Sequence, residues 1–97
     1  MATAILWTTR APDPLRDELA ALCFSVWEAL AYSEVTYLCE TEKIDIIIMT
    51  VGVDEERARE LRKRFITLRL HSSANTLSRD VVSTLWQLFP NAAETVQ

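Results

Sequence analysis

Apolar residues follow two alternating patterns along the chain. The first is a short run rich in β-branched and aromatic residues, which favours a β-strand. It occurs at residues 3–9 (TAILWTT), 24–30 (FSVWEAL), 44–50 (IDIIIMT) and 66–70 (ITLRL). The second is a recurrence of apolar residues every three or four positions, as on one face of a helix. It occurs at residues 14–22, 34–43, 55–64 and 77–89.

The starts of three predicted helices carry residues that cap helix N-termini. Asp13 stands directly before Pro14, which suits the first position of a helix, and Asp54 stands directly before an acidic first turn. Ser33 is the expected N-cap of the second helix. With these helix starts, the predicted strands and helices alternate from the first run to the last.

This order predicts an α/β fold of three layers, α/β/α, with a four-stranded parallel sheet of the (βα)4 type. The run at residues 44–50 is apolar on both faces, as a central strand covered by helices on each side must be. We expect residues 1–90 to form a single domain and residues 91–97 to form a frayed tail.

The last predicted helix carries more apolar residues than one buried stripe needs. We expect Val82, Leu85, Trp86 and Phe89 to form an interface with another chain. The strand at residues 66–70 has no fifth strand after it in the sequence, so it should lie at an edge that must be protected or paired. Both features predict a protein partner, most simply a second copy in a homodimer.

Composition narrows the functional class. The 97 residues carry a net charge of −4, which argues against nucleic-acid binding, because phosphate contacts require clustered Lys and Arg. No segment approaches the length of a membrane span and no signal peptide is evident, so we expect a cytoplasmic protein that does not bind membranes. Two cysteines and a lone histidine, His71, provide no metal-ligand set, and no cofactor motif is present.

One long segment resembles a known family. Residues 23–50, CFSVWEALAYSEVTYLCETEKIDIIIMT, fill without a gap the frame of the receiver domain of bacterial two-component response regulators, which runs from a strand like GYEVVEA to a strand like PDLVLLD. The similarity continues to ITLRLHSS, which resembles PVIVLTA, and covers about residues 4–73. The resemblance implies a flavodoxin-like fold, truncated before the fifth strand.

The positions where receivers keep their chemistry differ in this sequence. The resemblance places Thr8, Thr9 and Arg10 where a receiver has its Mg²⁺-binding acidic pair, and Thr50 where it has the phosphoacceptor aspartate. It places Ser72, or its neighbour Ser73, at the switch hydroxyl, and the lysine that should end a fifth strand has no counterpart. These differences imply a protein that is not an enzyme and that is not phosphorylated in the usual way.

Two functions remain open from the sequence. The first is a receiver-like signalling domain that acts through protein–protein contacts or homodimerisation. The second is a small flavodoxin-like domain that binds an anionic small molecule at the carboxyl ends of its strands, through Thr8–Arg10 and the loop at residues 71–76. Arg10 and the neighbouring hydroxyls would hold the anion in the second case.

Overall fold

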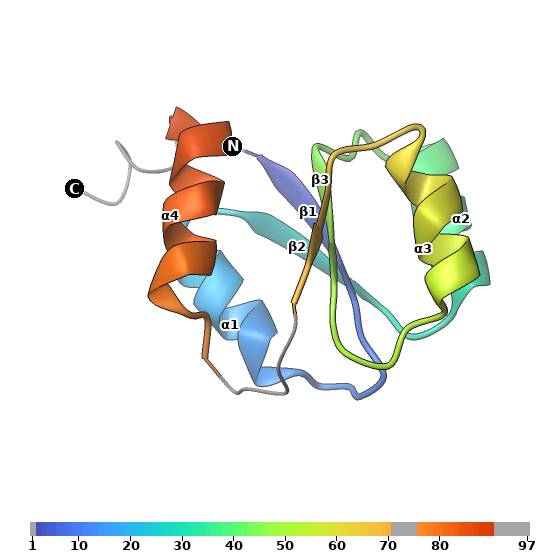
Figure 1. Cartoon of the computed structure of the whole chain (residues 1–97), viewed down its shortest axis with the longest axis horizontal. Coiled ribbons are helices and arrows are strands. Elements are labelled where there is room, and N and C mark those ends of the chain that lie inside the picture. The colour runs from blue at the N-terminus through green and yellow to red at the C-terminus, as the bar shows by residue number, and fades with distance from the viewer. Residues whose placement is uncertain (1, 71–75, 91–97) are drawn as a thin grey trace.

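Strands and helices alternate along residues 2–70 and 76–90, the part of the chain that the computed structural model describes (Figure 1). The strands are β1 (Thr3–Trp7), β2 (Ser25–Ala29), β3 (Ile46–Met49) and β4 (Thr67–Arg69). The helices are α1 (Pro14–Ala21), α2 (Tyr32–Thr41), α3 (Glu55–Arg62) and α4 (Arg79–Leu88). Every predicted element is present. Seven are shorter than their sequence patterns because the terminal residues of each run belong to the connecting turns, whereas α2 has the expected length and begins two residues earlier.

The four strands form one sheet in the order β2-β1-β3-β4, and all neighbouring pairs are parallel. At its centre Leu6 pairs with Glu28 on one side and with Ile48 on the other. The strand order reverses between β1 and β3, which defines a topological switch point. The predicted α/β class with a four-stranded parallel sheet is confirmed, and the arrangement is compatible with a flavodoxin-like (βα)4 fold.

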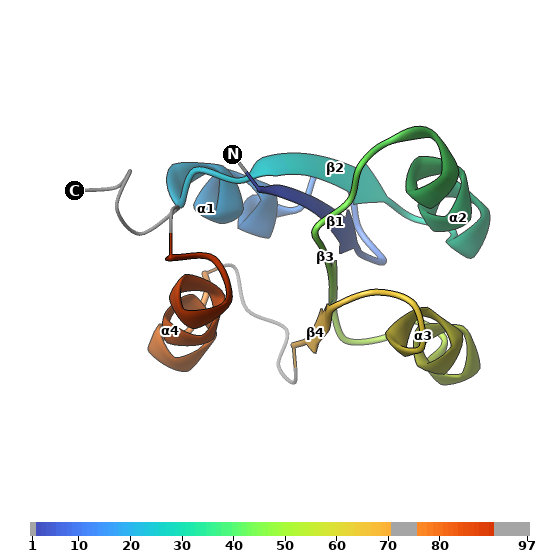
Figure 2. The same ribbon diagram turned by 90° about the horizontal axis from the view of Figure 1, so that it is seen from above.

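Helices cover both faces of this sheet, with α1 and α4 on one face and α2 and α3 on the other (Figure 2). The β3 strand explains why both faces must be covered. Ile46 and Ile48 pack into the core beneath α1 and α4, whereas Ile47 and Met49 pack into the core beneath α2 and α3. Successive side chains of a strand point to opposite faces, so an uninterrupted apolar run needs an apolar layer on each side.

The packing of α4 corrects one part of the predicted interface. Leu85 is 0% exposed and belongs to the core shared with α1, and Phe89 lies edge-on to Phe24 with ring centroids 5.6 Å apart. Leu85 therefore faces the sheet and is not available to another chain. Trp86 remains 38% exposed and Val82 half-buried, so the outer side of α4 keeps apolar surface.

The N-caps agree with the sequence at two helices and differ at the third. The carboxylates of Asp13 and Asp54 accept hydrogen bonds from backbone N–H groups in the first turns of α1 and α3. The prediction of Ser33 as the cap of α2 is wrong, because the helix begins earlier, at Tyr32. Ala31 is the N-cap, and the carboxylate of Glu34 reaches back to accept a hydrogen bond from the N–H of Ala31 at 3.2 Å.

Two further expectations concern the ends and surroundings of the chain. The tail predicted at residues 91–97 lies outside the described residues. Among the helices of residues 2–70 and 76–90, none has both the length and the apolar character that crossing a membrane requires.

Candidate functional site

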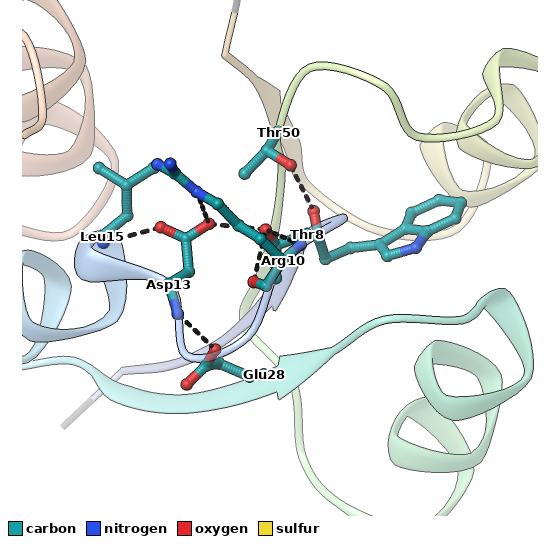
Figure 3. A network of polar contacts seen from close by, with 7 residues as sticks. Thr8, Arg10, Asp13, Leu15, Glu28 and Thr50 are labelled. Atoms are coloured by element: carbon teal, nitrogen blue, oxygen red, sulfur yellow. Dashed lines mark hydrogen bonds and ion pairs between the residues drawn. The ribbon is translucent and has the colours of Figure 1, made fainter. Parts of the chain in front are cut away.

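The carboxyl ends of β1 and β3 meet at the switch point, where the sequence places most of its candidate site residues (Figure 3). The backbone N–H of Thr50 donates to the carbonyl of Trp7 at 3.0 Å, and the N–H of Thr8 donates to the carbonyl of Ala29 at 2.9 Å. These hydrogen bonds fix the positions of Thr8 and Thr50 relative to the sheet.

Asp13 gathers the polar groups that follow β1. The residue is 3% exposed, and its carboxylate accepts hydrogen bonds from the hydroxyl of Thr8 at 2.6 Å and from the N–H of Leu15 at 2.9 Å. The Nε of Arg10 lies 3.6 Å from the same carboxylate. A buried carboxylate requires such partners, and here they are a neighbouring hydroxyl, a helix N-terminus and a guanidinium. Asp13 thus acts as a structural anchor between β1 and α1.

Glu28 extends this network to the edge strand β2. One carboxylate oxygen accepts the backbone N–H of Asp13 at 3.0 Å, and the other lies 3.3 Å from the guanidinium of Arg16 (Figure 3 shows the first contact). The structural role of Glu28 was not evident from the sequence, because its partners lie 12 and 15 residues away in the chain.

Thr50, at the position of the phosphoacceptor in the receiver resemblance, is turned back towards the sheet. The residue is 9% exposed, and its hydroxyl donates a hydrogen bond to the carbonyl of Trp7 at 3.4 Å. The following turn contains Gly52 at φ +99°, a conformation that residues with a Cβ adopt rarely. A Cβ at Gly52 would also lie 3.3 Å from the Cγ2 of Thr9, so this turn packs closely against the loop after β1.

The structure therefore brings together Thr8, Arg10 and Asp13, with Thr50 beside them, and places Thr9 against the next turn instead. Ser72, the predicted switch hydroxyl, and the rest of residues 71–75 lie outside the described residues. No group of three or more His, Cys, Asp or Glu side chains is placed to hold a metal ion within the ranges 2–70 and 76–90.

A hollow of about 640 Å³ opens at the same end of the sheet, on the face covered by α2 and α3. Trp7 and Thr9 border it from the end of β1, Tyr32 from the first turn of α2, and Gly52 and Arg57 from the turn after β3 and from α3. Sequence reasoning missed this site because its members come from three segments that are far apart in the chain. The one local signal was an aromatic residue at the end of β1, which a packing role explains equally well.

Cys39 differs from a reactive thiol. Burial raises the pKa of the Cys39 thiol, and the nearby guanidinium of Arg64 opposes that effect only in part. The neutral thiol is therefore favoured in the folded protein. At a given pH near the ordinary pKa of cysteine, Cys39 carries less thiolate in the folded protein than in the unfolded chain.

We predict that iodoacetamide alkylates Cys39 several-fold more slowly in the folded protein than in urea at mildly alkaline pH, because the thiolate is the reactive form. Peptide mass spectrometry of quenched samples measures this rate for Cys39 separately from Cys23. Equal rates in the folded and unfolded chain would contradict the effect of burial.

Comparisons of the chain with models of protein families, with curated proteins and with solved structures gave no match.

Proposed function

We propose that this chain is a non-catalytic, receiver-like signalling domain that acts through protein–protein contacts, with self-association as the simplest form. The observation that carries the proposal is the state of the Asp13 carboxylate. This carboxylate follows β1 next to Thr8 and Arg10, and it already accepts hydrogen bonds from the Thr8 hydroxyl and the Leu15 N–H and lies beside the guanidinium of Arg10. A carboxylate engaged in this way holds α1 in place and is not available to bind a catalytic metal ion.

The position of Thr50 supports the same reading. A threonine hydroxyl is a weak nucleophile unless a base removes its proton, and here the hydroxyl faces the carbonyl oxygen of Trp7. A carbonyl oxygen accepts a hydrogen bond but does not take the proton at neutral pH. The hydrogen bond to Trp7 therefore favours a structural role for Thr50 in the turn after β3.

The surfaces suited to contacts lie at the edge of the sheet and on α4. The carbonyl of Ile66 accepts a hydrogen bond from the N–H of Ile47, and the N–H of Leu70 donates to the carbonyl of Met49. The backbone groups of Thr67 and Arg69 therefore point away from β3, to the side of β4 on which no other described strand pairs. Ile66 itself is 49% exposed. An open edge with an apolar neighbour is a common site of strand pairing.

We expect the purified chain to form a reversible dimer in the micromolar range, and we expect Ile66→Lys to weaken it at least about tenfold by placing a charge beside the open edge. Sedimentation velocity over a concentration series measures both. Ala21→Lys is the matched control, because it adds the same charge to an exposed position on α1. A strict monomer at high micromolar concentration would contradict self-association.

We also expect no acid-labile phosphate on the chain after incubation with acetyl phosphate and Mg²⁺. Phosphate-affinity electrophoresis followed by peptide mass spectrometry detects such a label. Its appearance on Asp13 or Asp54 would show that the chain retains phosphotransfer chemistry and would refute the non-catalytic assignment.

A further inference from the structure

Arg57 presents a cation at the rim of the hollow on the α2/α3 face. Its guanidinium carbon lies 4.7 Å from the centre of the Tyr32 ring, and Tyr32 in turn packs on Trp7 with ring centroids 5.8 Å apart. Within the part of the chain that the structure describes, the guanidinium makes no ion pair with an acidic side chain. A cation–π contact of this kind holds a guanidinium near the ring while its N–H groups stay available for an anion.

The acidic residue nearest to Arg57 in the lining, Asp54, is already engaged. Its Oδ1 accepts hydrogen bonds from the backbone N–H groups of Glu56 at 2.9 Å and of Arg57 at 3.3 Å. These contacts offset part of the negative charge of Asp54, so it opposes anion binding less than an unbound carboxylate would.

Trp7 adds a donor that the fold leaves without a partner. The side chain is nearly buried, at 4% exposure, and its indole N–H donates to no group in residues 2–70 or 76–90. Among these residues, every fully buried side-chain nitrogen or oxygen has a hydrogen-bond partner. The indole N–H must therefore lie in the small exposed part of the ring, and Trp7 borders the hollow.

Two residues with hydroxyl groups complete the lining. Thr9 and Ser33 both border the hollow, and their hydroxyls form no hydrogen bond with another described group. The start of α2 contributes little, because the carboxylate of Glu34 accepts the N–H groups of Leu30 and Ala31 and its negative charge offsets the positive potential of this helix end.

From this arrangement we propose that the hollow binds a small organic ligand that carries an oxyanion, either a phosphate monoester or a carboxylate. The oxyanion is placed by Arg57, the Trp7 indole N–H and the hydroxyls of Thr9 and Ser33. The volume of about 640 Å³ lies in the range of sites for small organic molecules and exceeds what an inorganic ion needs. The exposed side chain of Leu30 provides an apolar wall for the remainder of the ligand.

This site shares Thr9 and the carboxyl ends of the strands with the site expected from the sequence, but it lies on the α2/α3 face, whereas Thr8 and Arg10 are engaged with Asp13. It is also independent of the proposed contact function. A ligand at this position would lie at the ends of β1 and β3, without using the β4 edge or α4.

The test follows the indole N–H signals in nitrogen-15 NMR spectra while phenyl phosphate, benzoate or inorganic phosphate is added to about 10 mM. Trp27→Phe and Trp86→Phe identify the Trp7 signal by elimination, since both removed rings are partly exposed. We expect a saturable shift of the Trp7 signal with phenyl phosphate or benzoate. The stronger of the two organic probes identifies the oxyanion class, and a weaker response to inorganic phosphate supports a site that also holds the organic part.

Arg57→Gln should weaken the organic probe at least about tenfold, because it removes a charge-assisted hydrogen bond. Arg59→Gln is the matched control, since it removes the same charge from an exposed position of the same helix, and it should change affinity less than about twofold. Thermal unfolding of both variants verifies that they are folded. A Trp7 signal that does not respond to any probe, or equal affinities in the two variants, would overturn the proposal.

Discussion

Replacing Leu85 with alanine is expected to lower the free energy of unfolding by about 2–5 kcal/mol, the usual cost of removing a fully buried leucine from a packed core. Leu85 is 0% exposed and packs with the α1 side of the sheet. The loss combines the transfer of apolar atoms with the cavity left behind. Urea unfolding followed by far-ultraviolet circular dichroism measures it, provided that the dependence on urea stays unchanged.

The neighbouring residue provides a matched control. Trp86 is 38% exposed, so Trp86→Ala should cost below about 1 kcal/mol although it removes a larger side chain. If Leu85→Ala left stability unchanged and instead abolished self-association, Leu85 would belong to an interface and the packing of α4 described here would be wrong.

Asp13→Ala is expected to destabilise the protein by about 2–4 kcal/mol, because it removes a helix N-cap and leaves a buried hydroxyl with a poorer partner. The carboxylate accepts from the Leu15 N–H and from the Thr8 hydroxyl, which could turn instead to the carbonyl of Arg10 at 3.1 Å. That alternative acceptor keeps the loss from being larger. Chemical unfolding at neutral pH gives the value.

Two variants separate capping from the buried network. Asp54 is also an N-cap but is exposed, so Asp54→Ala should cost only about 1 kcal/mol. Asp13→Asn retains an acceptor for the Leu15 N–H and should recover part of the loss. Equal losses for Asp13→Ala and Asp54→Ala would show that the network around Thr8 contributes nothing beyond the cap.

The receiver resemblance remains a prediction. The sheet order and the two helical layers are compatible with it, but they belong equally to other flavodoxin-like proteins, and function depends on the site rather than on the fold. The experiments above therefore address the groups at the strand ends directly, through phosphorylation of Asp13 or Asp54 and through ligand binding near Arg57.

Several features of the fold were predictable from residues close together in the chain. The run at residues 44–50 had to be central because it is apolar at both strand faces, and Ile46 to Met49 are buried on both. The caps Asp13 and Asp54 were predictable because a cap and the N–H groups that it binds lie within three residues. The prediction of Ser33 as an N-cap was wrong because α2 begins at Tyr32, and the carboxylate of Glu34, inside the helix, accepts the N–H of the actual N-cap, Ala31.

The sequence by itself determined the alternation of strands and helices, the parallel sheet and the side of each helix that is apolar. Those properties follow from the period of the hydrophobic pattern, which each element carries alone. Only the tertiary structure decided that α4 covers the same face as α1, that Leu85 is core while Trp86 is surface, and that Asp13 is engaged with Thr8 and Arg10. It also decided that Trp7, Tyr32 and Arg57 meet around one hollow, because contacts between loops depend on the order of the strands and not on any local pattern.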